Sequence, residues 1–147
     1  MSPKPHPIVR VTRRFSASPE RVFDAWLDPK KARKFLFATP TGEMVRVEID
    51  ARVGGSFCIV ERRDGQNAEH YGTYLEIDRP WRLVFTFSVE KYGTGGDRVT
   101  VEIVPLETGC ELTLTHEMRP EWAEYAGRAE AGWIGILDGL AAILGSG

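Results

Sequence analysis

The stretch Trp122–Leu144, WAEYAGRAEAGWIGILDGLAAIL, contains the one long helical pattern of this chain. Its large apolar residues recur at spacings of three and four, which places them on one face of an α-helix. They are Trp133, Ile136, Leu137, Leu140, Ile143 and Leu144. A lone amphipathic helix cannot bury such a face by itself. The pattern therefore predicts a helix that packs on a sheet formed by the preceding residues.

Four glycines interrupt this helical pattern, although each costs a helix about 1 kcal/mol relative to alanine. Three of them, Gly132, Gly135 and Gly139, are again three and four residues apart. Two interpretations are open. The missing side chains let the helix approach neighbouring backbone closely, or they leave room for a bound molecule beneath the helix.

Most of the chain before this helix alternates between apolar and polar residues, as strands do. Short helices are expected after Ser18-Pro19 and after Asp28-Pro29, the second ending at about Phe35, because each pair supplies a cap and a first-turn proline. A turn is expected at Asp64-Gly65, and a glycine-rich loop at Tyr92–Asp97. The expected strands are Ile8–Phe15, Glu43–Asp50, Ser56–Arg62, Ala68–Asp78, Arg82–Val89, Arg98–Pro105 and Cys110–Met118. Their short connections favour an antiparallel meander of six to seven strands wrapped around the helix, an α+β fold.

Length and composition fit one domain covering residues 1–147, with residues 1–7 as a flexible tail. The chain is 42% hydrophobic and 10% aromatic, which suffices for a core. Its net charge of −2, with acids and bases mixed, argues against a nucleic-acid partner. No apolar run approaches the roughly 20 residues that span a bilayer, and the first residues lack the apolar core of a signal peptide.

The two cysteines, Cys58 and Cys110, lie far apart and outside any metal-binding spacing. We therefore expect reduced thiols in a cytoplasmic protein, with no metal and no other cofactor. No nucleotide-binding, serine-hydrolase or zinc-protease motif is present in the sequence. The residue pattern leaves open whether the protein is a monomer or a homodimer.

Two histidines bear on a possible site. His116 shares strand parity with Leu112 and Leu114, so it is expected to face the buried side, either as a satisfied core residue or as a polar anchor or proton-transfer group. Alternation turns Glu48 and Glu102 away from that side, so no histidine–carboxylate dyad is expected. His70, near the start of its strand, is expected to be exposed.

Five segments together resemble a known family. They are SASPERVFDAWLDP at 16–29, DARVGGSF at 50–57, HYGTYLEIDRPWRLVFTF at 70–87, ELTLTH at 111–116 and GWIGILDGL at 132–140. The chain resembles the SRPBCC superfamily of helix-grip domains (START and birch-pollen-allergen-like), and within it the homologues of the activator of the Hsp90 ATPase. Phe35 and Phe87 stand where that family usually has tryptophan.

The resemblance implies a helix-grip fold that binds a small hydrophobic or aromatic molecule between sheet and C-terminal helix. The expected walls are Trp26, Phe57, Phe85, Phe87, Trp133 and Leu137. His116 and Tyr74 would orient the ligand, Tyr74 only if a bulge turns it inward, because alternation places Tyr71 and Tyr74 on opposite faces. No residue is assigned a catalytic role on this interpretation.

Two alternatives come from other functional classes. The first is an interaction module that stimulates a chaperone ATPase through exposed charges such as Lys30, Lys31 and Lys34. The second is an enzyme similar to polyketide cyclases and aromatases, with His116 as the general base.

Overall fold

A seven-stranded antiparallel sheet forms the larger part of the computed structural model, which describes residues 7–39, 41–88, 97–118 and 120–144. The strands are β1 (Ile8–Phe15), β2 (Glu43–Ile49), β3 (Ser56–Arg63), β4 (Gln66–Asp78), β5 (Arg82–Phe87), β6 (Asp97–Pro105) and β7 (Cys110–Glu117). Their order across the sheet is β1-β7-β6-β5-β4-β3-β2. The expected meander is therefore confirmed from β2 to β7, and β1 joins it by pairing with β7.

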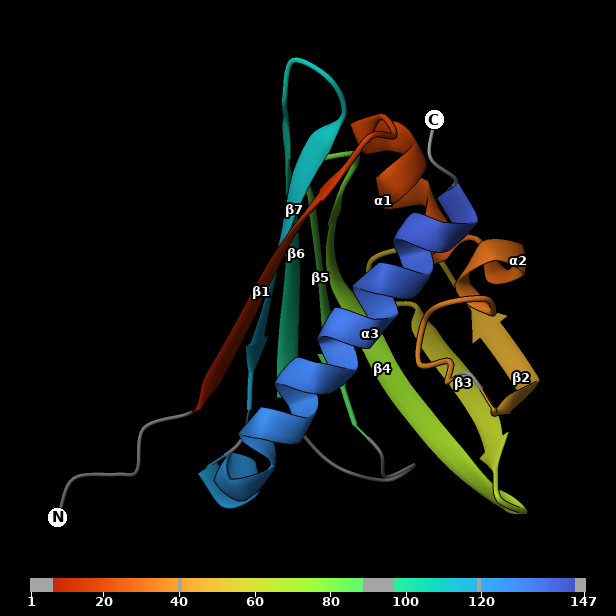
Figure 1. The fold of residues 1–147 in the computed structure, drawn as a ribbon. Helices are drawn as coiled ribbons and strands as arrows, with labels where there is room; N and C mark the ends of the chain where they lie inside the picture. Colours follow the sequence, from red (N-terminus) through yellow and green to blue (C-terminus); the bar gives the residue numbers. More distant parts are fainter. Residues whose placement is uncertain (1–6, 40, 89–96, 119, 145–147) are drawn as a thin grey trace, which may run out of the picture.

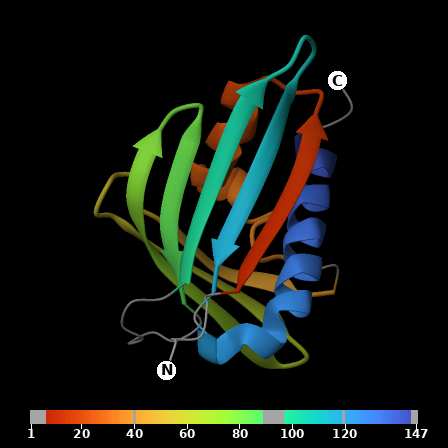
Figure 2. The same ribbon diagram turned by 90° about the vertical axis from the view of Figure 1, so that its left-hand side faces the viewer.

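Three helices lie on one side of this sheet (Figure 1). They are α1 (Pro19–Leu27), α2 (Pro29–Ala32) and the long α3 (Ala126–Leu144), which a 3₁₀ turn, η1 (Pro120–Tyr125), precedes. Figure 2 shows α3 running alongside β1, with α1 behind the strands. The predicted long helix on a sheet is confirmed, except that its first turn is 3₁₀.

Local sequence signals explain where the short elements begin. The Ser18 hydroxyl accepts a hydrogen bond from the Arg21 amide at 3.3 Å, and the Asp28 carboxylate accepts one from Lys30 at 2.9 Å. Asp64 and Gly65 both have positive φ, 50° and 79°, as a two-residue hairpin turn requires. That tight turn lets β4 begin at Gln66, two residues earlier than expected.

Two of the element boundaries that differ from expectation bear on the site. The helix α2 ends at Ala32 rather than near Phe35, and residues 33–37 continue as turns. Asp97 is the first residue of β6 and not the end of a loop, because it pairs with Phe87 of β5. The rest of the glycine-rich segment expected there, 92–96, and the tail at residues 1–6 lie outside the described residues.

The core lies between the inner face of the sheet and the helices, and one contiguous cluster of buried apolar side chains fills it. The outer face is polar, as is usual for an antiparallel sheet with one solvated side. Arg82 there makes ion pairs with Glu76 and Glu102, at 3.0 and 2.9 Å. The inner side of the sheet, by contrast, borders an opening beside the core.

Candidate functional site

A cavity of about 240 Å³ opens between the N-terminal half of α3, the inner face of the sheet and the segment that follows α2. Its lining is mainly apolar and aromatic, with two histidines and one arginine: Phe37, Ala38, Thr39, Arg63, His70, Phe87, His116, Ala129, Gly132, Trp133 and Ile136. Apolar walls with a few converging polar groups are characteristic of small-molecule sites.

Phe37 is at the centre of the aromatic lining. Its ring stacks on the His70 imidazole, with centroids 4.3 Å apart and planes 4° apart, and on Phe87 at 5.0 Å. Trp133 lies 5.7 Å from Phe37 at a tilt of 58°. Three nearly parallel rings and one tilted indole thus contribute to the lining.

Phe37 has a backbone conformation that needs support. Its φ of 58° lies in the left-handed region, which costs a residue with a Cβ about 1–2 kcal/mol. Arg63 Nη2 donates to the Phe37 carbonyl at 3.1 Å, and the Thr39 amide donates to the Glu61 carboxylate at 2.6 Å. These bonds from β3 hold the segment in place at the mouth of the cavity.

The carboxylate of Glu61 makes most of the hydrogen bonds that hold the segment after α2. It is almost fully buried, and it also accepts hydrogen bonds from the Thr39 hydroxyl and from Arg63 Nε. Burial alone would raise the pKa of Glu61, but the hydrogen bonds from Arg63 and Thr39 outweigh it and lower the pKa below its usual value. Gly42 leaves space for this carboxylate, because a Cβ there would come within 2.2 Å of it.

His70 is buried, so the expectation that it is exposed is wrong. It shares strand parity with Gly72 and Tyr74, and this face of β4 points inward. Burial lowers the pKa of His70 from 6.5 to about 4, although its hydrogen bond to the Ile59 carbonyl partly opposes this. His70 is therefore neutral at physiological pH.

The tautomer of His70 follows from its one hydrogen bond. Nδ1 lies 3.0 Å from the Ile59 carbonyl, which can only accept, so Nδ1 carries the proton and Nε2 has the lone pair. Among the described residues, only Arg13 Nε and Trp26 Nε1 are enclosed side-chain atoms without a partner. Nε2 of His70, which has no partner among those residues either, is therefore not enclosed, and His70 lines the cavity.

His116 is buried, as expected, and both of its ring nitrogens are used. The Trp133 indole N–H donates to Nδ1 at 3.0 Å, so Nδ1 is unprotonated and Nε2 carries the proton. Nε2 donates to the Asp97 carboxylate at 2.9 Å. The two consecutive hydrogen bonds that link Asp97, His116 and Trp133 thus fix the indole that forms one cavity wall.

The expectation that no carboxylate partners His116 is wrong, although Glu48 and Glu102 do point outward and are exposed. The partner is Asp97. Val99 is paired with His116 across β6 and β7, so Asp97, two residues before Val99, lies on the same inner face. Asp97 falls in the loop predicted from the sequence, at Tyr92–Asp97, and the alternation rule for strands does not assign a face to loop residues.

The eight expected ligand-binding residues separate into two groups. Phe87, His116 and Trp133 line the cavity. The other five are buried in the core outside its lining: Trp26, Phe57, Tyr74, Phe85 and Leu137.

Tyr74 and Trp26 illustrate why those five do not line the cavity. Tyr74 faces inward without a preceding bulge, since the register shift of β4 follows it, and it packs on Phe57 and Phe85. Burial raises the pKa of its phenol. Trp26 packs edge-on against Phe35 at 5.4 Å, away from the cavity.

The two interpretations of the helix glycines apply to different residues. A Cβ on Gly139 would lie 3.3 Å from Phe35 Cβ, so this glycine permits close packing. Gly132 lines the cavity, and a Cβ there would meet nothing within 4 Å. Gly135 also has open space around it but does not line the cavity.

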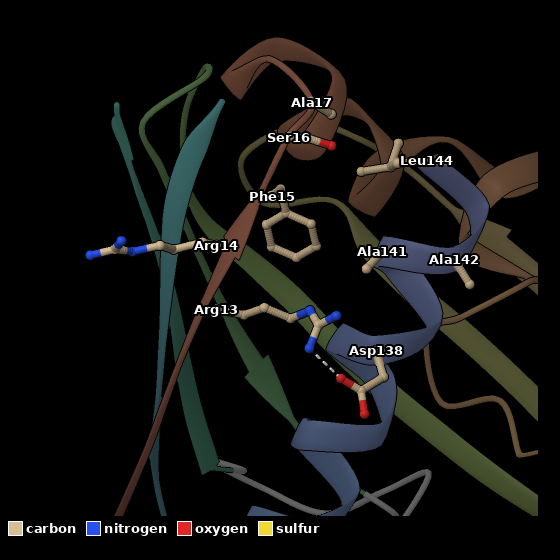
Figure 3. A pocket seen from close by; sticks show the side chains of 9 residues that line it. All are labelled: Arg13, Arg14, Phe15, Ser16, Ala17, Asp138, Ala141, Ala142 and Leu144. Carbon is tan, nitrogen blue, oxygen red and sulfur yellow. Dashed lines mark hydrogen bonds and ion pairs between the residues drawn. The ribbon is translucent and has the colours of Figure 1, made fainter. Parts of the chain in front are cut away.

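A larger but more open groove of about 660 Å³ lies between β1 and the C-terminal part of α3 (Figure 3). Its prominent charged groups, Arg13 and Asp138, form an ion pair with each other across the groove. The apolar residues of its lining are Phe15, Ala17, Ala141, Ala142 and Leu144. Because its facing charges are already paired, we favour the smaller aromatic cavity as the functional site.

The sequence matches the family described as activator of Hsp90 ATPase homolog 1-like protein over residues 16–145. The chain belongs to this family. It is thereby an SRPBCC protein with the helix-grip fold, as the resemblance implied. No protein with a curated description matches the sequence.

Solved structures agree with this assignment. A protein of Chromobacterium violaceum is 33% identical, with a TM-score of 0.82, and the match covers 92% of this chain and 95% of that chain. The AHSA1-like protein of Aeromonas hydrophila is 22% identical, with a TM-score of 0.79 and coverage of 92% and 90%. A protein of unknown function from Staphylococcus aureus, 20% identical with a TM-score of 0.80 and coverage of 94% and 93%, shares the fold.

Two general features of the described residues complete the description. No helix among them is both long enough and apolar enough to span a bilayer. In the same residues, no group of three or more histidine, cysteine, aspartate or glutamate side chains is placed to hold a metal ion.

Proposed function

We propose that this protein binds a small, flat aromatic molecule in the cavity beneath α3. The observation that carries the proposal is the arrangement of Phe37, Phe87 and Trp133 around an opening beside the buried core. The Asp97–His116 pair also supports the proposal. It holds the Trp133 indole in one orientation, as a preorganised binding site requires.

The size of the cavity limits the ligand. An apolar cavity of about 150 Å³ binds benzene, so 240 Å³ has room for one ring or two fused rings. Drug-sized ligands occupy sites of about 300–1,000 Å³, which is larger than this cavity. We therefore expect a compact bicyclic molecule to fit better than a lipid or a long polyketide.

The hydrogen bonds of His116 bear on its proposed roles. Because Trp133 donates to one ring nitrogen and the other donates to Asp97, His116 has no free nitrogen for a ligand or for a substrate proton. We therefore propose that His116 positions Trp133 and that the protein acts as a binding protein, not as a cyclase with His116 as its base.

Calorimetric titration with indole and benzofuran, two flat bicyclic probes, tests the proposal. Wild-type protein should bind at least one of them, and Phe87→Ala should weaken that binding about tenfold by removing one ring contact. Trp26→Phe is the matched control, because Trp26 is a buried aromatic residue outside the lining and its indole nitrogen has no partner. If neither probe binds, or if Phe87→Ala binds like wild type, the proposal is wrong.

The family description supports a second candidate, stimulation of a chaperone ATPase. The structure offers an exposed basic cluster for it on and after α2: Lys30, Lys31, Arg33 and Lys34. An ATPase assay with the chaperone of the same organism, comparing wild type with Lys30→Glu/Lys31→Glu, would test it. We place either activity in the cytoplasm, which suits the reduced thiols of Cys58 and Cys110.

A further inference from the structure

The cavity contains a hydrogen-bond acceptor that the protein does not satisfy. The proton of His70 lies on Nδ1, bound to the Ile59 carbonyl, so Nε2 presents a lone pair. The Phe37 ring covers one face of this imidazole at 4.3 Å, which fixes the plane in which the lone pair points. An acceptor in an apolar surrounding gains most from a donor in that plane.

The other polar side chains of the lining already make hydrogen bonds within the protein. Arg63 donates to Glu61 and to the Phe37 carbonyl, and the Thr39 hydroxyl donates to Glu61. His116 uses both nitrogens. Among the histidine nitrogens of the lining, His70 Nε2 is therefore the one that remains for a ligand.

The charges near the cavity argue against an anionic ligand. Arg63 is the one permanently charged cation in the described lining, and its charge is balanced by the buried carboxylate of Glu61. A second carboxylate, that of Asp97, lies behind His116. An anion entering this space would lose its hydration without meeting an unbalanced positive charge.

We propose that the ligand is an uncharged aromatic molecule with a ring-borne hydrogen-bond donor, an N–H or a phenolic O–H, which it donates to His70 Nε2. This assignment rests on the proposed function, since it names the class of molecule that the aromatic cavity accepts. His70 is then the residue that selects the ligand, and Phe37, Phe87 and Trp133 supply the contact area.

A pair of isosteric probes tests the donor without altering the protein. Indole and benzofuran have the same shape, but indole has an N–H where benzofuran has an oxygen. In calorimetric titrations of the wild-type protein, indole should bind about tenfold more tightly, the equivalent of one well-formed hydrogen bond. Equal binding, or tighter binding of benzofuran, would overturn the inference while leaving the aromatic cavity in place.

The variant His70→Phe tests whether His70 is the hydrogen-bond acceptor. It keeps a ring for Phe37 to stack on but removes the acceptor, so the preference for indole over benzofuran should fall to about one. If the variant does not fold, the wild-type comparison still decides the question. Should the variant fold and keep the full preference, His70 is not the acceptor and the inference fails.

Indole carboxylate tests the charge argument. We expect it to bind more weakly than indole to the wild-type protein, because no unbalanced cation meets its carboxylate. Tighter binding of the carboxylate would overturn the assignment of an uncharged ligand. Failure of all three probes to bind is a different result, since it would reject the proposed function itself together with this inference.

Discussion

The two buried histidines differ in the number of ring nitrogens that the protein uses. His116 bonds through both nitrogens, to Trp133 and to Asp97, and so is a structural residue that holds a wall. His70 bonds through one nitrogen and directs the other at the cavity. A lone pair that no protein group uses, on a residue that lines an apolar cavity, is available to a donor on a ligand.

The pKa of His70 leads to a prediction about stability. Its folded-state pKa of about 4 lies below its ordinary value of 6.5, so as pH falls the unfolded chain takes up this proton first. The free energy of unfolding should therefore decrease as pH falls from about 6.5 to 4, by at most about 3 kcal/mol from this residue. Urea denaturation at a series of pH values measures it.

The variant His70→Phe should lose this part of the pH dependence. Tyr71→Phe, on the neighbouring residue of β4, is the control and should keep the wild-type slope. A slope in His70→Phe identical to that of wild type would show that another group causes it.

At the scale of elements, α3 combines two kinds of helical glycine. Gly139 packs closely on Phe35, where a Cβ would make a tight contact, whereas Gly132 and Gly135 have open space and cost the helix stability. Of these two, Gly132 alone faces the cavity. No packing contact requires a glycine at position 132. Its missing side chain does leave the cavity accessible from outside.

The pair Gly132→Leu and Gly135→Leu separates these roles. Each substitution should stabilise the protein by up to about 1 kcal/mol, since leucine is the better helix former and a Cβ at either position meets no neighbour. Only Gly132→Leu should weaken indole binding, by at least tenfold, because its side chain extends over the mouth of the cavity. Thermal denaturation of both variants measures the change in stability, and calorimetric titration measures the change in affinity for indole.

One result with the two glycine variants would contradict binding beneath α3. If Gly132→Leu binds indole as well as Gly135→Leu does, the opening beneath α3 is not the route or the site of binding. Gly135 is a suitable control because it lies on the same helix with the same open surroundings.

On the scale of the whole molecule, the cavity belongs to no single element. Phe37 follows α2, His70 and Phe87 lie on β4 and β5, His116 on β7 and Trp133 on α3. The segment with Phe37 is held in turn by Glu61 and Arg63 of β3. The site therefore exists only when sheet, helix and connecting segment are assembled, and it should disappear on unfolding.

Ligand binding should consequently stabilise the whole fold. A ligand that binds only the folded state, present at ten times its Kd, contributes about 1.4 kcal/mol, which for a chain of this size raises Tm by roughly 3–6 °C. Differential scanning calorimetry with and without indole measures the shift, and Phe87→Ala should show little of it. Calorimetric binding without any change in Tm would indicate a site that survives unfolding, contrary to this cavity.

The fold could be predicted from the sequence because its signals are local and repeated. Alternation defined the strands, spacings of three and four defined α3, and Ser18 and Asp28 capped the two short helices. The inward direction of His116 followed from parity with Leu112 and Leu114 in the same way. Each of these depends on neighbours within a few residues, which a single sequence displays directly.

The cavity was decided by tertiary structure. The place of Phe37 in the lining depends on a left-handed backbone, and Arg63 and Glu61 of β3 hold that segment from outside its own turn. Asp97 became the partner of His116 only through the pairing of β6 with β7. The sequence by itself determined which residues could be buried aromatics, but only the packing of helix on sheet decided which of them leave a space between them.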